Sequence, residues 1–170
     1  MMDNFEKCLD MVLKSEGGFV NDPHDPGGMT NLGVTARVWG DYTKKPATEA
    51  VMRALTKADV APLYREYYWA VTRCSALPDG VDYLVFDMAV NMGVGKAARL
   101  LQKALGVKED GVIGMKTLDE VNRVEAAELI KRLSDLKEAF YRSLPTFGTF
   151  GKDWLARAET VESASLGMVG

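Results

Sequence analysis

Residues 14–35 read K-S-E-G-G-F-V-N-D-P-H-D-P-G-G-M-T-N-L-G-V-T, and this stretch decides how the rest of the chain is interpreted. Before it, apolar side chains recur at helical spacing, which predicts a helix that carries Glu16 at its C-terminal end. Gly17 and Gly18 are expected to stop this helix. The glycines and prolines that follow predict a long irregular segment over residues 19–47, with a short hairpin, and a loop of that length is typically functional.

Glu16 has the position expected of a catalytic acid. It projects from the helix face that Val12 and Leu13 bury, at the helix end where unpaired carbonyls make the local potential negative. Both effects disfavour the ionised carboxylate. A carboxyl group that holds its proton near neutral pH is what general-acid cleavage of a glycosidic bond needs. The alternative is that Glu16 is a rim residue whose carboxylate reaches water.

The loop after Glu16 contains candidates for the second part of such a site. Its prolines and glycines allow it to fold back and place Asp25 and Thr30 opposite Glu16. There, a second carboxylate would stabilise positive charge or activate water, and the hydroxyl would position that water. Asp22 competes with Asp25 for the carboxylate role. The other interpretation of Asp22 is a turn in which its side chain binds the nearby backbone.

The remainder of the chain is predicted to be almost entirely helical, so the fold class is mainly α. Thr48 and the Thr56/Asp59 pair have the sequence pattern of helix N-caps. Residues 79–92 are apolar nearly all round, which predicts a central buried helix. The other helices are expected over residues 48–55, 56–69, 96–105, 115–122, 125–144 and 153–166.

Polar and aromatic residues outside the loop add candidates for substrate binding. Asp87 and Asn91 are four residues apart on the central helix and share a face. Asn91 either lines a cleft or, with Asp87, ties neighbouring helices together.

Four aromatic residues, Trp39, Tyr67, Tyr68 and Trp69, could stack on sugar rings or pack in a core. Because Tyr68 and Trp69 are adjacent, we expect one of each kind.

Composition narrows the class of protein. The chain has 170 residues, 47% of them hydrophobic, and a net charge of -3, which predicts one compact domain and gives no basic excess for nucleic acid. Two cysteines, Cys8 and Cys74, cannot form a disulfide framework. The single histidine, His24, argues against a zinc amidase or a cysteine peptidase, so no metal and no cofactor is expected. No apolar stretch is long enough to span a membrane.

The stretch E-G-G-F-V-N-D-P-x-D-P-G-G-M-T-N-x-G-V-T resembles the signature of glycoside hydrolase family 108, the N-acetylmuramidases of phage endolysins and bacteria. Three further motifs are similar to the second half of that family, which is described as a predicted peptidoglycan-binding region. They are Y-Y-W at 67–69, D-x-x-x-N-x-G at 87–93 and L-Q-K-A-L-G-V-x-x-D-G-V-I-G-x-x-T at 101–117. The resemblance implies a lysozyme-like, mainly helical fold with Glu16 as the catalytic acid.

The resemblance also implies an organisation and an activity. Residues 1–90 would form the catalytic region, and residues 91–170 a helical lobe packed with it, where the apolar residues of 101–117 either pack or bind wall. The expected reaction is hydrolysis of the β-1,4 bond between N-acetylmuramic acid and N-acetylglucosamine. A lytic transglycosylase, and more distantly a non-catalytic wall-binding or secretion-associated protein, are the alternatives. The spacing also resembles that of T4-type phage lysozymes, whose Glu, Asp and Thr fall at comparable intervals. In the present sequence, Glu16 and Asp25 keep the Glu-to-Asp interval, whereas Thr30 comes one residue earlier than in that pattern.

The N-terminus M-M-D-N-F-E-K has no basic segment followed by an apolar run, so no signal peptide is expected. We therefore expect a monomeric endolysin that gathers in the host cytoplasm and acts on the wall after a holin-like membrane protein releases it.

Overall fold

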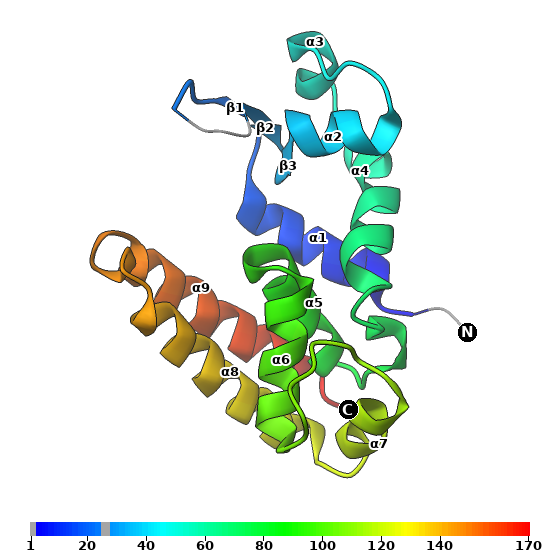
Figure 1. The fold of residues 1–170 in the computed structure, drawn as a ribbon, viewed down its shortest axis with the longest axis vertical. Helices are drawn as coiled ribbons and strands as arrows, with labels where there is room; N and C mark the ends of the chain where they lie inside the picture. The colour runs from blue at the N-terminus through cyan, green and yellow to red at the C-terminus, as the bar shows by residue number, and fades with distance from the viewer. Residues whose placement is uncertain (1–2, 25–27) are drawn as a thin grey trace. The chain divides into compact units, whose positions relative to one another are not determined.

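The computed structural model describes residues 3–24 and 28–170 and is mainly helical, with one small antiparallel sheet (Figure 1). The chain packs as two compact units. The small unit is Glu6–Tyr67, and the large unit is formed by residues 68–170 together with the N-terminal residues up to Phe5. These two units are defined by packing, and their boundaries differ from the boundary at residue 90 that the sequence predicts between a catalytic region and a second lobe. That functional division stays a prediction.

The small unit contains the first eight elements. They are α1 (Phe5–Glu16), β1 (Val20–Asn21), β2 (Met29–Asn31), β3 (Val34–Thr35), α2 (Ala36–Thr43), α3 (Glu49–Arg53), α4 (Lys57–Tyr64) and the start of the π-helical segment Arg65–Trp69. Threonine, a favoured N-cap residue, caps the N-termini of α2, α3 and α4. Thr35 accepts from the N–H of Val38 and Thr48 from that of Val51. Thr56 and Asp59 form the expected capping box.

The prediction of a long irregular segment with a short hairpin over residues 19–47 was wrong in one part. The expected hairpin is present and extends to three strands, in the order β1-β2-β3. The missed element is α2, which buries none of its residues and has Gly40 inside it. The helix is only eight residues long and contains a glycine, which disfavours helix formation, so its sequence resembles that of a loop.

The large unit is a helical bundle around α5 (Val81–Met92), whose residues 81–89 are all buried. This confirms the predicted central helix. The helices α6 (Val94–Leu105), α8 (Ala126–Ser143) and α9 (Phe147–Met168) pack against it and against one another. Gly80 precedes α5 at φ +90°, where a Cβ would collide with the backbone of Ser165 on α9. A short 3-10 turn, Cys74–Ala76, and α7 (Met115–Val121) complete this unit.

A buried ion network joins three of these helices. The carboxylate of Asp87 on α5 is fully buried and accepts from Lys137 Nζ on α8 at 3.0 Å. Its other oxygen accepts from Arg157 Nη2 on α9 at 2.8 Å. Asn91 Nδ2 adds a third hydrogen bond at 3.0 Å. Since a buried charge is costly unless it is paired, this network fixes how α5, α8 and α9 pack within the unit.

Helix α9 begins at Phe147, earlier than the predicted start at 153. The sequence T-F-G-T-F-G over 146–151 looks unlike a helix because of its glycines. Gly151 has a packing reason, since a Cβ there would collide with the ring of Phe147.

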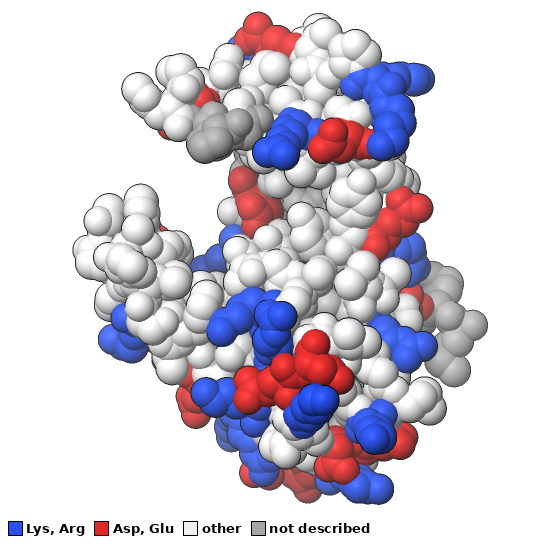
Figure 2. Space-filling view, viewed as in Figure 1, with Lys and Arg blue, Asp and Glu red and all other residues white. Residues whose placement is uncertain are grey.

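Charged side chains of both signs are interspersed on the face shown in Figure 2, as expected for a net charge of -3. Within the described residues, no helix combines the length and the hydropathy that crossing a bilayer requires.

Candidate active site

Glu16 is the last residue of α1, and its side chain is half-buried. The helix ends as predicted, because Gly17 adopts φ +77° and its N–H donates to the carbonyl of Leu13 at 3.3 Å. The chain then enters β1 within four residues. Glu16 therefore projects from a rigid helix at the point where the chain turns into the sheet of the small unit.

The turn between β2 and β3 lies directly against the stem of Glu16. Leu32 and Gly33 both have positive φ, 52° and 76°, as a tight two-residue hairpin requires. A Cβ on Gly33 would lie 2.9 Å from Cγ of Glu16 and 2.5 Å from Oη of Tyr64. Only glycine fits between these side chains.

Tyr64 fixes this turn from α4. Its hydroxyl donates to the carbonyl of Leu32 at 2.7 Å, and its side chain is buried. On β2, the buried amide of Asn31 donates to the carbonyl of Met52 at 2.8 Å, which ties the sheet to α3. The sequence reasoning missed Gly33 and Tyr64 as residues of the site. The glycine of N-L-G was visible, but its contact with Glu16 depends on packing.

Thr30 lies on β2 and pairs with Val20 on β1 and with Thr35 on β3. This register brings Thr30 beside the segment that leaves Glu16, and Thr30 is half-buried. Asp22 is exposed, and its Oδ1 accepts from the N–H of His24 at 2.9 Å. That contact is the local turn considered above as one interpretation of Asp22. Asp25 lies outside the described residues, so its role stays a prediction.

Asn91 lies at the last turn of α5 in the large unit and is exposed, while its amide donates to buried Asp87. Its link to Asp87 makes it part of the network that ties helices. It also lines a pocket of roughly 320 Å³ within the large unit, together with Phe140, Trp154 and Arg157. Both interpretations of Asn91 thus have a structural counterpart, and substrate binding by Asn91 stays a prediction.

The two neighbouring aromatic residues differ, as expected for adjacent positions. Trp69 is 1% exposed and packs edge-on against Phe5 and Phe86, with ring centroids 5.5 and 5.2 Å away. Its indole N–H donates to Ser75 at 2.8 Å. Trp69 is therefore a core residue in this structure, with no ring face left for a sugar. Tyr68 is half-buried, and sugar stacking by Tyr68 stays a prediction.

The segment 101–117 of the large unit is held by a buried glutamine. Gln102 Nε2 donates to Asp110 Oδ1 at 2.8 Å and to the carbonyl of Val112 at 2.9 Å. Gln102 Oε1 accepts from the N–H of Gly111 at 2.9 Å. The N–H of Val112 and the amide of Gln102 both hold the pKa of the Asp110 carboxyl below its usual range. The polar groups of this turn are thus engaged in maintaining its shape.

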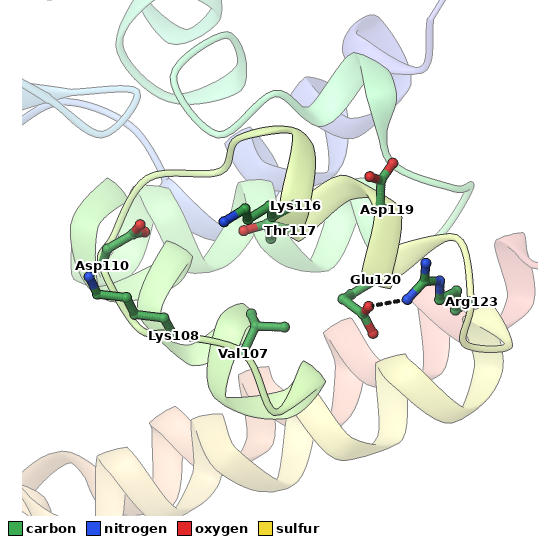
Figure 3. Close-up of a pocket in the computed structure, with 8 residues that line it drawn as sticks. All are labelled: Val107, Lys108, Asp110, Lys116, Thr117, Asp119, Glu120 and Arg123. Carbon is green, nitrogen blue, oxygen red and sulfur yellow. Dashed lines mark hydrogen bonds and ion pairs between the residues drawn. The ribbon is translucent and has the colours of Figure 1, made fainter.

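An open pocket of roughly 500 Å³ lies between this turn and α7 (Figure 3). Lys108 and Asp110 line it from the turn, whereas Lys116 and Glu120 line it from α7. Arg123 closes one end, where it forms an ion pair with Glu120 at 2.6 Å. The lining contains cations and anions in equal number, so its charge alone does not favour one kind of ligand.

Within residues 3–24 and 28–170, no group of three or more histidine, cysteine or acidic residues is arranged to hold a metal ion. Glu16 offers a carboxyl group at a helix end, with the Gly33 turn packed against its stem. Together with the mainly helical fold and small sheet, this arrangement is that of a lysozyme-like glycosidase.

Comparison with known proteins agrees with this class. The family profile described as Glycosyl hydrolase 108 matches residues 9–93. The solved structure of SagA from Brucella abortus is 40% identical, with a TM-score of 0.87, and the match covers 97% of this chain and 95% of that one. Among curated proteins, none matches the chain. The chain belongs to glycosyl hydrolase family 108 and is a glycoside hydrolase. Membership of this family supports peptidoglycan hydrolysis of the N-acetylmuramidase type.

Proposed function

We propose that the chain is an endolysin-type N-acetylmuramidase in which Glu16 is the general acid. Glu16 donates a proton to the oxygen of the β-1,4 bond as that bond between N-acetylmuramic acid and N-acetylglucosamine breaks. The observation that carries this proposal is the contact of Glu16 with the Gly33 turn, which Tyr64 fixes through Leu32. A catalytic carboxyl group must be held to within a fraction of an ångström, and this packing supplies that rigidity.

Asp25, or failing that Asp22, supports the positive charge of the transition state or activates water. Thr30, on the strand paired with β1, positions that water. Tyr68 and Asn91 contact the glycan. No metal takes part in this mechanism.

Replacing the acid tests the first step. We expect Glu16→Gln to lower lysis of purified peptidoglycan by about a hundredfold or more, because it removes the proton donor while keeping the side chain's shape. Glu6→Gln is the matched control on the same helix. Its exposed carboxylate pairs with Lys57 at 3.1 Å, so its loss should leave activity unchanged. Circular dichroism would verify that both variants fold. Normal lysis by Glu16→Gln would exclude this mechanism.

The products separate the proposal from its nearest alternative, a lytic transglycosylase. In that reaction the substrate's own hydroxyl attacks in place of water, and one glutamate suffices. Mass spectrometry of the digest, with and without borohydride, distinguishes the two. Reducible muramic acid ends support hydrolysis and give Asp25 and Thr30 a water molecule to handle. Anhydro-muramic ends would show a transglycosylase. A digest with neither product would leave a non-catalytic wall-binding protein.

We also propose the site of action. The enzyme gathers in the cytoplasm as a monomer and reaches the wall when a holin-like membrane protein opens the inner membrane. Cells that express the chain alone should keep growing, and they should lyse within minutes of adding chloroform, which permeabilises the membrane. Lysis without permeabilisation would contradict this order of events. Contact of residues 91–170 with the wall belongs to the same proposal, and the pocket between residue 107 and Arg123 is where that contact would be sought.

A further inference from the structure

A pocket on the small unit contains none of the residues described at the Glu16 site. It has a volume of roughly 750 Å³ and lies between α2, α3 and the segment that connects them. Six residues line it: Trp39, Thr43, Lys45, Pro46, Thr48 and Val51.

The local backbone creates this pocket. The segment after α2 packs beside Gly40, where a Cβ would be in ordinary van der Waals contact with the carbonyl oxygen of Lys45, at 3.5 Å. Lys44 ends α2 in the left-handed conformation at φ 59°, and its N–H donates to the carbonyl of Gly40. The chain therefore turns sharply and carries Lys45 and Pro46 back along the helix. Because α2 buries none of its residues, its aromatic side chains remain available on this side.

Trp39 belongs to a cluster of three aromatic rings. Its ring centroid lies 5.8 Å from that of Tyr42, and Tyr67 packs edge-on against Tyr42 at 5.6 Å. The side chain of Tyr42 also hydrogen-bonds Glu66. A half-buried tryptophan that is fixed in this way loses little conformational entropy when a ligand stacks on it.

The polar groups around the pocket are donors. The indole N–H of Trp39 and the ammonium group of Lys45 have no hydrogen-bond or ion-pair partner among the described residues. Thr48 Oγ1 already accepts from the N–H of Val51 at 3.3 Å, which leaves its hydroxyl proton to donate. No carboxylate belongs to the lining, and Pro46 and Val51 supply apolar surface. The matching ligand has an apolar face and an edge rich in acceptors, as an N-acetylated sugar has in its ring face and its acetamido and ring oxygens.

We infer that the Trp39 pocket is an accessory glycan-binding site, which takes an N-acetylhexosamine unit of the wall apart from the bond that is cut. The identity of the polymer rests on the proposed function. The sugar ring stacks on Trp39, and its acceptors face Lys45 and Thr48. The site would hold the enzyme on insoluble wall between successive cleavages.

Indole signals in a ¹H–¹⁵N spectrum test this site directly. The chain has three tryptophans, and the signal of Trp39 is the one lost in Trp39→Phe. We expect that signal to shift on titration with the N-acetylglucosamine tetramer, in the Glu16→Gln protein so that nothing is cleaved. The signal of buried Trp69 should stay in place as an internal control. A Trp39 signal that is stationary at millimolar tetramer would overturn the inference.

Wall binding provides the second test, again in the Glu16→Gln background. We expect Trp39→Ala to weaken sedimentation with insoluble peptidoglycan roughly fivefold to tenfold, as loss of an aromatic anchor does. Val71→Ala removes an exposed apolar side chain that lies outside both the pocket and residues 91–170, and it should bind as the parent does. Lys45→Ala, with an intact aromatic cluster, should weaken binding less. Equal binding by all variants would overturn the inference, whereas intact lysis by Glu16→Gln alone would overturn only the proposed function.

Discussion

The small and large units use polar residues in opposite ways. In the large unit, charged groups are buried and paired, as where Asp87 meets Lys137 and Arg157. In the small unit, Glu16 is half-buried at a helix end, and glycine and a single tyrosine hydroxyl determine its surroundings. On the proposed mechanism, the group that donates the proton and the ion network that stabilises the helical bundle lie in different units. Substitutions should therefore separate them, and the four that follow are ordered by expected effect.

Asp87→Ala should have the largest effect on stability. It leaves the ammonium of Lys137 buried without its carboxylate, so we expect the free energy of unfolding to fall by about 3–5 kcal/mol. Urea denaturation followed by circular dichroism measures this. Asn91→Ala removes only one neutral donor from the same carboxylate and should cost about 1 kcal/mol. Similar losses for both variants would show that the network is not what holds the large unit.

Gly33→Ala should damage activity more than stability. The alanine would have to adopt positive φ, and its Cβ would collide with the side chains of Tyr64 and Glu16. Because the collision displaces the acid, we expect about a hundredfold loss of lysis. The matched control is Gly106→Ala, at φ +72° in the large unit with no atom within 4 Å of its Cβ. Both variants carry backbone strain of about 1–2 kcal/mol, and only the first should lose activity. Full activity of Gly33→Ala would remove the turn from the proposed mechanism.

Thr56→Ala should have a moderate effect, because it removes the capping box of α4, the helix that carries Tyr64. We expect a loss of about 1 kcal/mol in thermal or urea unfolding. Thr160→Ala is the control, since this exposed hydroxyl only donates within α9. If the two variants unfolded alike, the capping box would contribute nothing measurable.

The smallest effect is expected when the folded protein is treated with a thiol reagent, because both cysteines are buried. Both Cys8 and Cys74 are buried, and burial raises the pKa of the Cys74 thiol to about 12. At pH 8 that thiol is protonated and should not react with a thiol reagent until the large unit opens. Labelling of Cys8→Ala and Cys74→Ala reports each remaining thiol separately. We expect Cys8, in the smaller unit, to label first, and the reverse order would show that the large unit opens more readily.

Local sequence signals predicted much of this structure. The caps at Thr48 and Thr56, the stop at Gly17 and the buried helix of residues 81–89 each depend on a few neighbouring residues, and all are present. The missed helix, α2, is only eight residues long and contains Gly40, a residue that disfavours helix formation.

The site was less predictable, because its contacts join residues that are not neighbours in the sequence. Glu16 stood out by its position at a helix end, whereas its contact with Gly33 joins residues far apart in the chain. Nothing near Tyr64 in the sequence indicates that its hydroxyl binds the carbonyl of Leu32. For Trp69 the sequence left sugar stacking and core packing open, and its packing against Phe5 and Phe86 shows that it is a core residue.

The first described residues have a consequence for how the chain is made. Ser75 donates to Asp3 at 2.6 Å, and Asn4 donates to Asp79 and Asp82 at 2.8 and 2.9 Å. These partners lie 72 to 78 positions later in the chain, so the ribosome delivers them well after the N-terminal residues have emerged. The residues of the small unit lie between these N-terminal residues and the rest of the large unit, so all of them are synthesised before the large unit can begin to assemble. The segment with the candidate acid is thus synthesised first, and the N-terminal residues wait for the bundle that binds them.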